Sequence, residues 1–482
     1  MALDLLTDLM GVVPTACDYA EARHVDRLTE WVAVRNGAVD RIESDEGAGL
    51  GVRVRIGGAW GFAATDDVSP GGARRALARA IAVAEAQPRG ASPWAAALAP
   101  EPPARGHWAS PCAQDPFAVS LDDRLAHLLA ADAAMDGDAR VVRHQASCQA
   151  SRTRWAFAST EGAACTQEIT TCGGGLSALA AYDEEAQVRS YPSNHGGSVA
   201  QAGWEQVLAL ELAAHAPRIA AEAVELLRAP PCPEGERTLV IGAEQLALQV
   251  HESIGHALEL DRILGGEASY AGTSWVGAAD IGRLRYGSER LHVTADATLP
   301  GALGSFAWDD EGVAAQRMPL VVDGVLRATL SDRTSAAAVG LPRSGGCARA
   351  DGYARQPIVR MTNVSLEAGD AGTLADLIAD TDDGIYVETN RSWSIDDRRL
   401  HFQFGTEVSR EIKNGALGRL YRNACYAGVT PRFWSALDAV CSPEAWEVQG
   451  LLNCGKGEPG QMMEVSHGVA PARFRGVQVG AG

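Results

Sequence analysis

The stretch QVHESIGHALEL at residues 249–260 contains the side chains best suited to carry out chemistry. His251, Glu252 and His256 lie in an apolar pattern of helical period. A His-Glu pair followed by a second His is the sequence form of a metal site on a helix. In such a site the imidazoles bind the ion and the carboxylate acts as general base. The stretch therefore predicts a catalytic metal site.

The two histidines stand five positions apart, one more than in the usual His-Glu-x-x-His pattern. On a regular helix, positions five apart are rotated by about 140° from each other, against about 40° for positions four apart. Imidazoles separated in this way cannot easily hold one ion, whereas a π-bulge would return them to one side. We therefore predict a bulge or break between His251 and His256, with Gly255 supplying backbone freedom.

A catalytic zinc site usually has three protein ligands and one open position for water, so a third ligand is required. Cys454 is the favoured cysteine, because it lies in the Gly-rich loop predicted at residues 453–457 and a thiolate binds zinc well. Other His, Cys, Asp or Glu residues stay open as third ligand. Lys456 either lowers the pKa of the thiol, faces a developing oxyanion at the substrate, or is a solvated loop residue.

The elements that position these residues belong to a mainly β segment after Pro230-Pro231-Cys232-Pro233. Residues 238–241 form a predicted short strand, and residues 244–260 form the helix that carries the histidines. Two tight hairpins are predicted at Asp323-Gly324 and Asn414-Gly415. We therefore expect a C-terminal catalytic domain at residues 230–482, mainly antiparallel, that carries the metal-site helix.

The preceding residues, 1–229, are predicted to form an N-terminal α/β domain. Strands and helices follow each other in a similar order twice, which suggests an internal duplication, with a Pro- and Ala-rich linker near residues 87–116. One long helix is predicted at residues 204–227, and Gly173-Gly174-Gly175 predicts a β-bulge. The fold class expected for the whole chain is α+β.

Composition excludes several classes of protein. The chain has 482 residues and a net charge of −19, which argues against a nucleic-acid partner. Its 10 cysteines form no Cys-x-x-Cys pair, and no apolar run approaches the roughly 20 residues that span a membrane. We expect a cytoplasmic protein with free thiols and no membrane partner.

Other functional readings stay open at this point. A Ser or Cys nucleophile with a His base, drawn from His195, His401 or His467, is an alternative without a supporting Gly-x-Ser-x-Gly motif. Trp393 and Trp434 either line a peptide groove or pack in a core or interface.

The sequence resembles the TldD/PmbA family of metallopeptidases, on the TldD side. The resemblance covers nearly the whole chain and is most specific at HESIGHALELD, residues 251–261, because the paired TldE/PmbA-type subunit lacks the His-Glu-x-x-x-His element. Further matching segments are GVRVRIGGAWGFAATDDVSP at 51–70, SFAWDDEGVAAQRMPLVVDGVL at 305–326, SDRTSA at 331–336, RQPIVRMTNVSLEAGD at 355–370, FQFGTEVSREIKNGALGR at 402–419 and NCGKGEPGQ at 453–461.

The resemblance implies a zinc site with His251, His256 and Cys454 as ligands and Glu252 as catalytic base. It implies an N-terminal α/β domain with a curved antiparallel sheet and flanking helices. It also implies a heterodimer with a metal-free TldE/PmbA-type partner, with a homodimer as the alternative. The expected activity is hydrolysis of unfolded or leader-type peptides. The alternatives are a non-catalytic binding or scaffold subunit with a structural metal, and a hydrolase with Cys454 as nucleophile. Residues 388–396 depart from the family pattern, so substrate specificity does not carry over.

Overall fold

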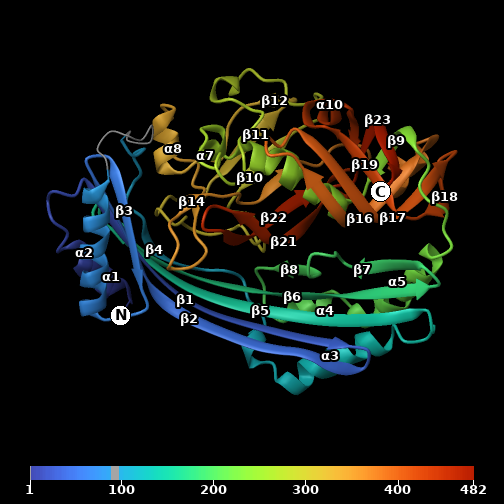
Figure 1. The fold of residues 1–482 in the computed structure, drawn as a ribbon, viewed down its shortest axis with the longest axis horizontal. Coiled ribbons are helices and arrows are strands. Elements are labelled where there is room, and N and C mark those ends of the chain that lie inside the picture. The colour runs from blue at the N-terminus through green and yellow to red at the C-terminus, as the bar shows by residue number, and fades with distance from the viewer. Residues whose placement is uncertain (1, 88–96) are drawn as a thin grey trace.

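The computed structural model describes residues 2–87 and 97–482. A long curved sheet forms the N-terminal half, and the C-terminal half packs over one face of it (Figure 1). The fold is a mixed α+β arrangement with largely antiparallel sheets, which confirms the predicted fold class. Among the described residues, no helix combines the length and apolar character required to cross a bilayer.

The N-terminal sheet has eight strands in the order β3-β2-β1-β5-β6-β4, and both β7 and β8 also pair with β6. Asn36 and Gly37 adopt positive φ, at 49° and 78°, and turn β1 back into β2. The strands are β1 (Tyr19–Arg35), β2 (Ala38–Ile56), β3 (Ala59–Thr65), β4 (Arg105–Ala109), β5 (Val141–Ser159), β6 (Ala164–Tyr182), β7 (Glu185–Tyr191) and β8 (Ser198–Ala200).

Part of the predicted linker at residues 87–116 is structured. Residues 88–96 of that linker lie outside the described residues. Further on, β4 pairs parallel with β6, from Arg105 opposite Ala164 to Ala109 opposite Glu168. This strand has too few alternating apolar residues to be recognised from its sequence, because its side chains are mostly exposed.

Helices cover the N-terminal sheet, and their starts follow the capping residues of the sequence. Ser69 accepts a hydrogen bond from the amide of Gly72 at the start of α2, and Ser120 does the same for Asp123 at the start of α3. The helices of this half are α1 (Ala2–Met10), α2 (Pro70–Ala86), α3 (Leu121–Ala133), α4 (Glu205–Ala209) and α5 (Leu212–Leu226). The prediction of one helix at 204–227 is therefore wrong, because Glu211 adopts a left-handed φ of 46° and separates α4 from α5.

The prediction of a β-bulge at the three glycines of β6 is also wrong. Gly173, Gly174 and Gly175 pair in continuous register with residues 147–149 of β5. Their lack of side chains instead permits close backbone approach. A Cβ on Gly175 would lie 2.5 Å from the Cα of Gly197, and one on Gly173 would lie 2.1 Å from the Ser198 carbonyl oxygen.

The C-terminal half contains a seven-stranded sheet in which β16, β9, β23, β19 and β17 pair in a closed ring. The Asn414-Gly415 hairpin joins β17 to β18, as predicted, with Asn414 at a φ of 49°. The strands are β9 (Gly235–Ile241), β16 (Asp383–Ile395), β17 (His401–Lys413), β18 (Ala416–Tyr421), β19 (Ala424–Val429), β20 (Leu437–Val440) and β23 (Ala472–Ala481). The only parallel pair in this sheet is β9 with β16.

Smaller sheets complete this half. The Asp323-Gly324 hairpin joins β11 to β12, which confirms the second predicted tight turn. The four-stranded sheet contains β10 (Val293–Asp296), β11 (Arg317–Val322), β12 (Val325–Leu326) and β15 (Val364–Leu366), and the two-stranded sheets contain β13 (Ala348–Arg349) with β14 (Ile358–Val359) and β21 (Glu447–Lys456) with β22 (Gln461–Val469). The loop predicted at 453–457 is therefore mostly the end of β21.

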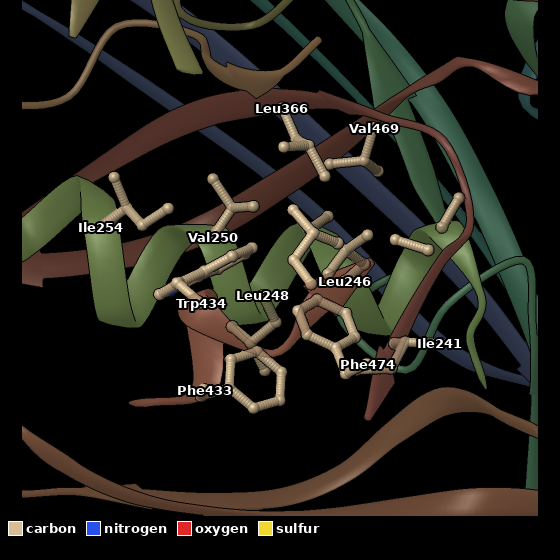
Figure 2. Close-up of a cluster of buried hydrophobic side chains, with 14 of the residues drawn as sticks. Ile241, Leu246, Leu248, Val250, Ile254, Leu366, Phe433, Trp434, Val469 and Phe474 are labelled. Carbon is tan, nitrogen blue, oxygen red and sulfur yellow. The ribbon is translucent and has the colours of Figure 1, made fainter. Parts of the chain in front are cut away.

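The helix that leads into the two histidines, α6 (Ala243–Val250), lies in the largest apolar core of the described residues. Figure 2 shows Leu246, Leu248 and Val250 of this helix among Trp434 and Phe474, which belong to distant segments. Fully burying an apolar side chain of this size contributes roughly 1.5–3 kcal/mol. The site is therefore carried by a helix with little freedom to move. The remaining helices are α7 (Leu260–Ile263), α8 (Arg333–Ala338), α9 (Leu374–Ala379) and α10 (Thr430–Ser435).

Candidate metal centre

The helix α6 does not continue as a regular helix through the predicted site. It passes into one π turn at His251–Gly255, in which the amide of His256 donates to the carbonyl of His251. A short 3-10 turn, His256–Leu258, follows. The predicted bulge between the two histidines is therefore confirmed. Their rings lie with centroids 4.7 Å apart and planes 84° apart.

Polar contacts around Ser253 stabilise this turn. Its hydroxyl donates to the carbonyl of Gln249 at 2.6 Å and accepts from the indole N–H of Trp434 at 2.9 Å. Its backbone carbonyl accepts from the hydroxyl of Tyr286 at 2.5 Å. Tertiary partners thus satisfy polar groups of a turn whose backbone bonding is irregular.

Gly255 is required in the turn because it lacks a side chain, and not because its backbone adopts an unusual conformation. Its φ of −53° is an ordinary helical value. A Cβ at this position would lie 2.0 Å from the Sδ of Met361. The glycine therefore permits close packing of the π turn against the segment that precedes β15, which corrects the predicted reason for its presence.

The structure brings the three predicted ligands together. One ligand atom from each of His251, His256 and Cys454 lies within 4.8 Å of the others, and all three side chains are buried. The Sγ of Cys454 is 3.6 Å from Nε2 of His256. Tetrahedral zinc with bond lengths of about 2.0–2.3 Å places its ligand atoms roughly 3.3–3.8 Å apart. A small contraction of this N, N, S set would therefore suit zinc.

A third histidine orients His251. Nδ1 of His251 lies 2.8 Å from Nε2 of His467, and Nδ1 of His467 lies 2.6 Å from the carbonyl oxygen of Val364. The carbonyl can only accept, so His467 carries its proton on Nδ1 and accepts at Nε2 from Nδ1–H of His251. This leaves the Nε2 lone pair of His251 for a metal. Burial lowers the pKa of His251 to about 4, so its ring is neutral near pH 7.

A carboxylate orients His256. Nδ1 of His256 lies 3.0 Å from Glu259, so the ring donates there and keeps its Nε2 lone pair toward Cys454. Glu259 is completely buried and lies 3.6 Å from the guanidinium of Arg262. Burial opposes ionisation, but the ammonium of Lys456, the imidazole N–H of His256 and the guanidinium of Arg262 hold the pKa of Glu259 well below its usual value.

Lys456 lies behind this carboxylate and not at a substrate position. Its Nζ is 2.7 Å from Asp261 and 3.3 Å from Glu259, and it donates to the carbonyl of Val359 at 2.6 Å. The side chain is fully buried. These partners occupy the ammonium group, so the predicted contact with substrate or oxyanion is replaced by a structural role. The pairing of β21 with β22 carries the lysine into the core.

The backbone of Cys454 is anchored beside His256 by a hydrogen bond to a buried arginine. Its carbonyl accepts from the guanidinium of Arg360. Burial alone would raise the pKa of the thiol, but the charges of His256 and Arg360 outweigh it, and the pKa of Cys454 lies below its usual value. The sulfur is therefore biased toward the thiolate, which is the form that binds metal.

Glu252 follows His251 on the π turn and is buried. Its carboxylate lies 2.7 Å from the guanidinium of Arg399, a residue held at a left-handed φ of 61°. Burial would raise the pKa of Glu252, but the nearby imidazoles of His251 and His256, the guanidinium of Arg399 and the indole N–H of Trp393 bring it below the usual value. Trp393 thus lies beside the predicted base, although its indole is 43% exposed.

The buried His, His, Cys cluster with a carboxylate beside it has the donor set of a protein metal site. Family comparison agrees with this description. The PmbA/TldA metallopeptidase domain 1 matches residues 20–84, the central domain matches residues 114–229, and the C-terminal domain matches residues 234–481. The chain belongs to the PmbA/TldD family.

Relatives and solved structures extend the comparison. A metalloprotease of Methanothermobacter thermautotrophicus is 28% identical over 99% of this chain and 98% of its own length. A zinc metalloprotease TldD homolog of Saccharolobus solfataricus is 26% identical over 51% of this chain and 52% of its own. The crystal structure of TldE from Thermococcus kodakarensis shares the fold, with a TM-score of 0.76 at 16% identity over 99% of this chain and 100% of that one.

Proposed function

We propose that this chain is a zinc-dependent peptidase that hydrolyses unfolded or leader-type peptides. The observation that carries the proposal is the convergence of His251, His256 and Cys454 beside the carboxylate of Glu252. The first three residues would supply two nitrogens and a sulfur, which leaves a fourth position for water. The printed names of the relatives, which include a zinc metalloprotease, support the same class of activity.

The chemistry divides between the ion and the protein. When bound, zinc lowers the pKa of a coordinated water and polarises a carbonyl group. Glu252 accepts a proton from the attacking water at its carboxylate and returns it to the nitrogen of the leaving amine, which departs as the C–N bond breaks. Arg399 lies 2.7 Å from this carboxylate and favours its ionised form before the reaction. When substrate is present, the carboxylate would accept hydrogen bonds from both Arg399 and the attacking water.

The peptide would reach the site between the two halves of the chain. A cavity of about 240 Å³ lies there, lined by sheet residues such as Thr153 and Gln167 and by Leu452 and Met463, while His251, Glu252, His256 and Cys454 do not line it. Met463 pairs directly with Cys454 in the β21–β22 hairpin. Because an extended peptide binds to sheet edges through its main chain, we expect broad preference for unfolded chains.

We further propose that the partner is a TldE/PmbA-type chain without the His-Glu-His element, with a homodimer as the alternative. The likeness in fold to a TldE structure supports this, because chains of one fold can pair through related surfaces. The ten cysteines are free thiols, and a thiolate ligand suits the reducing cytoplasm in which we place the protein.

Two substitutions test the proposal, with metal content and cleavage of an unfolded casein as the readouts. Glu252→Gln should keep about one zinc per chain and the melting temperature while it loses cleavage, because an amide cannot accept the proton. Cys454→Ser should lose zinc, whereas Cys441→Ser, at a buried thiol outside the cluster, should keep it. Cleavage by the Glu252→Gln variant at the rate of the unaltered chain would contradict the base assignment.

A second candidate function deserves a test, because the 3.6 Å distance between Cys454 and His256 also suits a thiolate nucleophile with a histidine base. Iodoacetamide and 1,10-phenanthroline distinguish the two. Inhibition by the chelator, reversed by added zinc, favours the metallopeptidase. Inhibition by alkylation of metal-depleted protein that still cleaves casein would favour the thiol enzyme. Zinc binding without any cleavage, with or without the partner chain, would favour a scaffold with a structural metal.

A further inference from the structure

A histidine of the N-terminal half, His195, packs against Trp393 of the C-terminal half, which lies beside the predicted base Glu252. His195 lies in the loop at residues 192–197, between β7 and β8. The loop is closed on itself, because the hydroxyl of Ser193 donates to the carbonyl of Gly197 at 2.7 Å and accepts from the amide of His195 at 3.2 Å. Its shape is therefore set by its own backbone.

The loop packs closely against the glycines of β6. A Cβ on Gly197, where φ is 84°, would lie 1.9 Å from the carbonyl oxygen of Gly174, and one on Gly175 would lie 2.5 Å from the Cα of Gly197. A side chain at Gly175 or Gly197 would therefore push the loop away from the sheet, whereas a Cβ on Gly174 would meet Ser147 of β5. The glycine run of the sequence, which is not a bulge, thus holds the His195 loop against the large sheet.

The His195 ring lies close to the predicted catalytic groups. Its edge meets the indole of Trp393 with centroids 5.5 Å apart and planes 68° apart. The same indole lies beside Glu252 and helps to lower the pKa of its carboxyl group. The pKa of His195 falls to about 4, chiefly through burial and also through the nearby imidazole of His251, so the His195 ring is neutral near pH 7.

One nitrogen of this ring has no partner. Nε2 of His195 is buried and makes no hydrogen bond within the described residues. Leaving a buried polar group without a partner costs free energy, and a bound ligand that accepts its hydrogen bond would recover this cost. The guanidinium of Arg399 also lies beside the site; its Nη1 is 2.7 Å from Glu252, and its Nε is buried without a partner among the described residues. In the tautomer that carries its proton on Nε2, the neutral ring of His195 can donate to a substrate without adding a charge.

We propose that His195 is a further catalytic residue, whose Nε2–H donates a hydrogen bond to the substrate carbonyl oxygen as it becomes an oxyanion. This rests on the proposed peptidase function. The neutral ring supplies the bond without adding a charge to the site, and its buried position makes the bond stronger than in water. The role also accounts for the closed loop at residues 192–197, which holds His195 against Trp393.

Variants of His195 test this in the zinc-loaded chain, together with its partner if cleavage requires one. His195→Ala should lower kcat for casein-derived peptides by about 100-fold with little change in KM and in zinc content, because only transition-state stabilisation is lost. His195→Gln should recover part of the rate through its amide N–H. A phosphinic peptide, which mimics the tetrahedral intermediate, should bind about 100-fold more weakly to His195→Ala, whereas a product peptide should bind unchanged.

His127→Ala is the matched control. Its ring also has a buried Nε2 without a partner and also meets a tryptophan edge-on, Trp204, with centroids 5.9 Å apart, but it lies under the large sheet. This variant should keep its kcat. A His195→Ala variant with unchanged kcat and unchanged phosphinate binding would overturn the inference and leave the peptidase intact.

Two other outcomes are decisive as well. If the unaltered chain binds zinc but cleaves no peptide, the proposed function fails and this inference fails with it. If His195→Ala does not fold, His195→Gln decides the question, because equal losses in product-peptide and phosphinate binding by that variant would indicate a merely structural histidine.

Discussion

The two flanks of the π turn support their metal ligands by different means. Before the turn, hydrogen bonds between neutral groups prevail, as in the contact of His251 with His467 and that of Gln245 with Tyr426. After the turn, buried charges prevail, and Glu259 lies among His256, Lys456 and Arg262. A single helical segment thus changes from a neutral to an ionic environment within a few residues.

The difference shows how two histidine ligands can differ in basicity, and therefore in affinity for the metal, through the groups behind them. A carboxylate behind an imidazole makes the ring more basic, whereas a second imidazole only fixes its orientation. His256 should therefore bind the ion more strongly than His251. The ionic flank also depends on complete charge balance, because removing one partner leaves another charge buried and unpaired.

Loss of the central carboxylate should have the largest effect. Glu259→Ala leaves Lys456 and Arg262 without one of their partners, which should cost about 3–5 kcal/mol of unfolding free energy. It should also weaken zinc binding about 10- to 100-fold. Urea unfolding and chelator competition measure the two effects. Asp383→Ala, which removes an exposed pair with Lys413, is the control and should cost less than about 1 kcal/mol. Similar costs for both variants would show that the flanks do not differ.

Removal of the neutral support should affect the metal more than the fold. His467→Phe deprives Nδ1 of His251 of its acceptor, so zinc affinity should fall about 10-fold, at the low end of what such orienting partners contribute. His467→Gln should recover part of the affinity, because its amide can both donate to Val364 and accept from His251. Chelator competition measures the affinity. A His467→Phe variant with unaltered zinc affinity would mean that His251 needs no such partner.

The last effect concerns pH and the carboxyl group of Glu244, which lies on the neutral flank. Burial raises the pKa of Glu244 from 4.5 to about 8, although its carboxylate accepts a hydrogen bond from the Asn390 amide. The folded chain therefore keeps this proton while the unfolded chain releases it, so the unfolding free energy falls as pH rises from about 4.5 to 8. Glu244→Gln cannot ionise and lacks this fall.

The melting temperature of Glu244→Gln relative to the unaltered chain should therefore be higher at pH 8.5 than at pH 5. Thermal unfolding followed by circular dichroism measures it. Glu46→Gln, at an exposed position of β2, should show no such dependence. A constant difference between Glu244→Gln and the unaltered chain across this range would show that Glu244 is ionised in the fold, as Glu259 is.

Features that depend on local spacing were predictable. The five-residue separation of His251 and His256 required a π turn, and the turn is present because bond geometry along a helix is the same in every protein. The tight hairpins at Asp323-Gly324 and Asn414-Gly415 were likewise encoded by two residues each. Such signals need no knowledge of distant segments.

Features that depend on distant pairing were harder to predict. The buried position of Lys456 matched none of its predicted alternatives, because its partner Asp261 belongs to another element and no local pattern connects the two residues. A signal for His467 did exist. Met463 stands opposite Cys454, and positions 463, 465 and 467 share one face of β22 by the two-residue period of a strand. The position of His195 required the tertiary packing of its loop on β6, which no period reveals.

The order of the ligands along the chain has a consequence for synthesis. His251 and His256 leave the ribosome long before Cys454, whose sulfur reaches them only after β21 has paired with β22. A growing chain with only the first two ligands holds an ion weakly. If cleavage depends on that ion, translation itself delays the appearance of proteolytic activity, and the cell is protected from a half-made enzyme without a separate inhibitor.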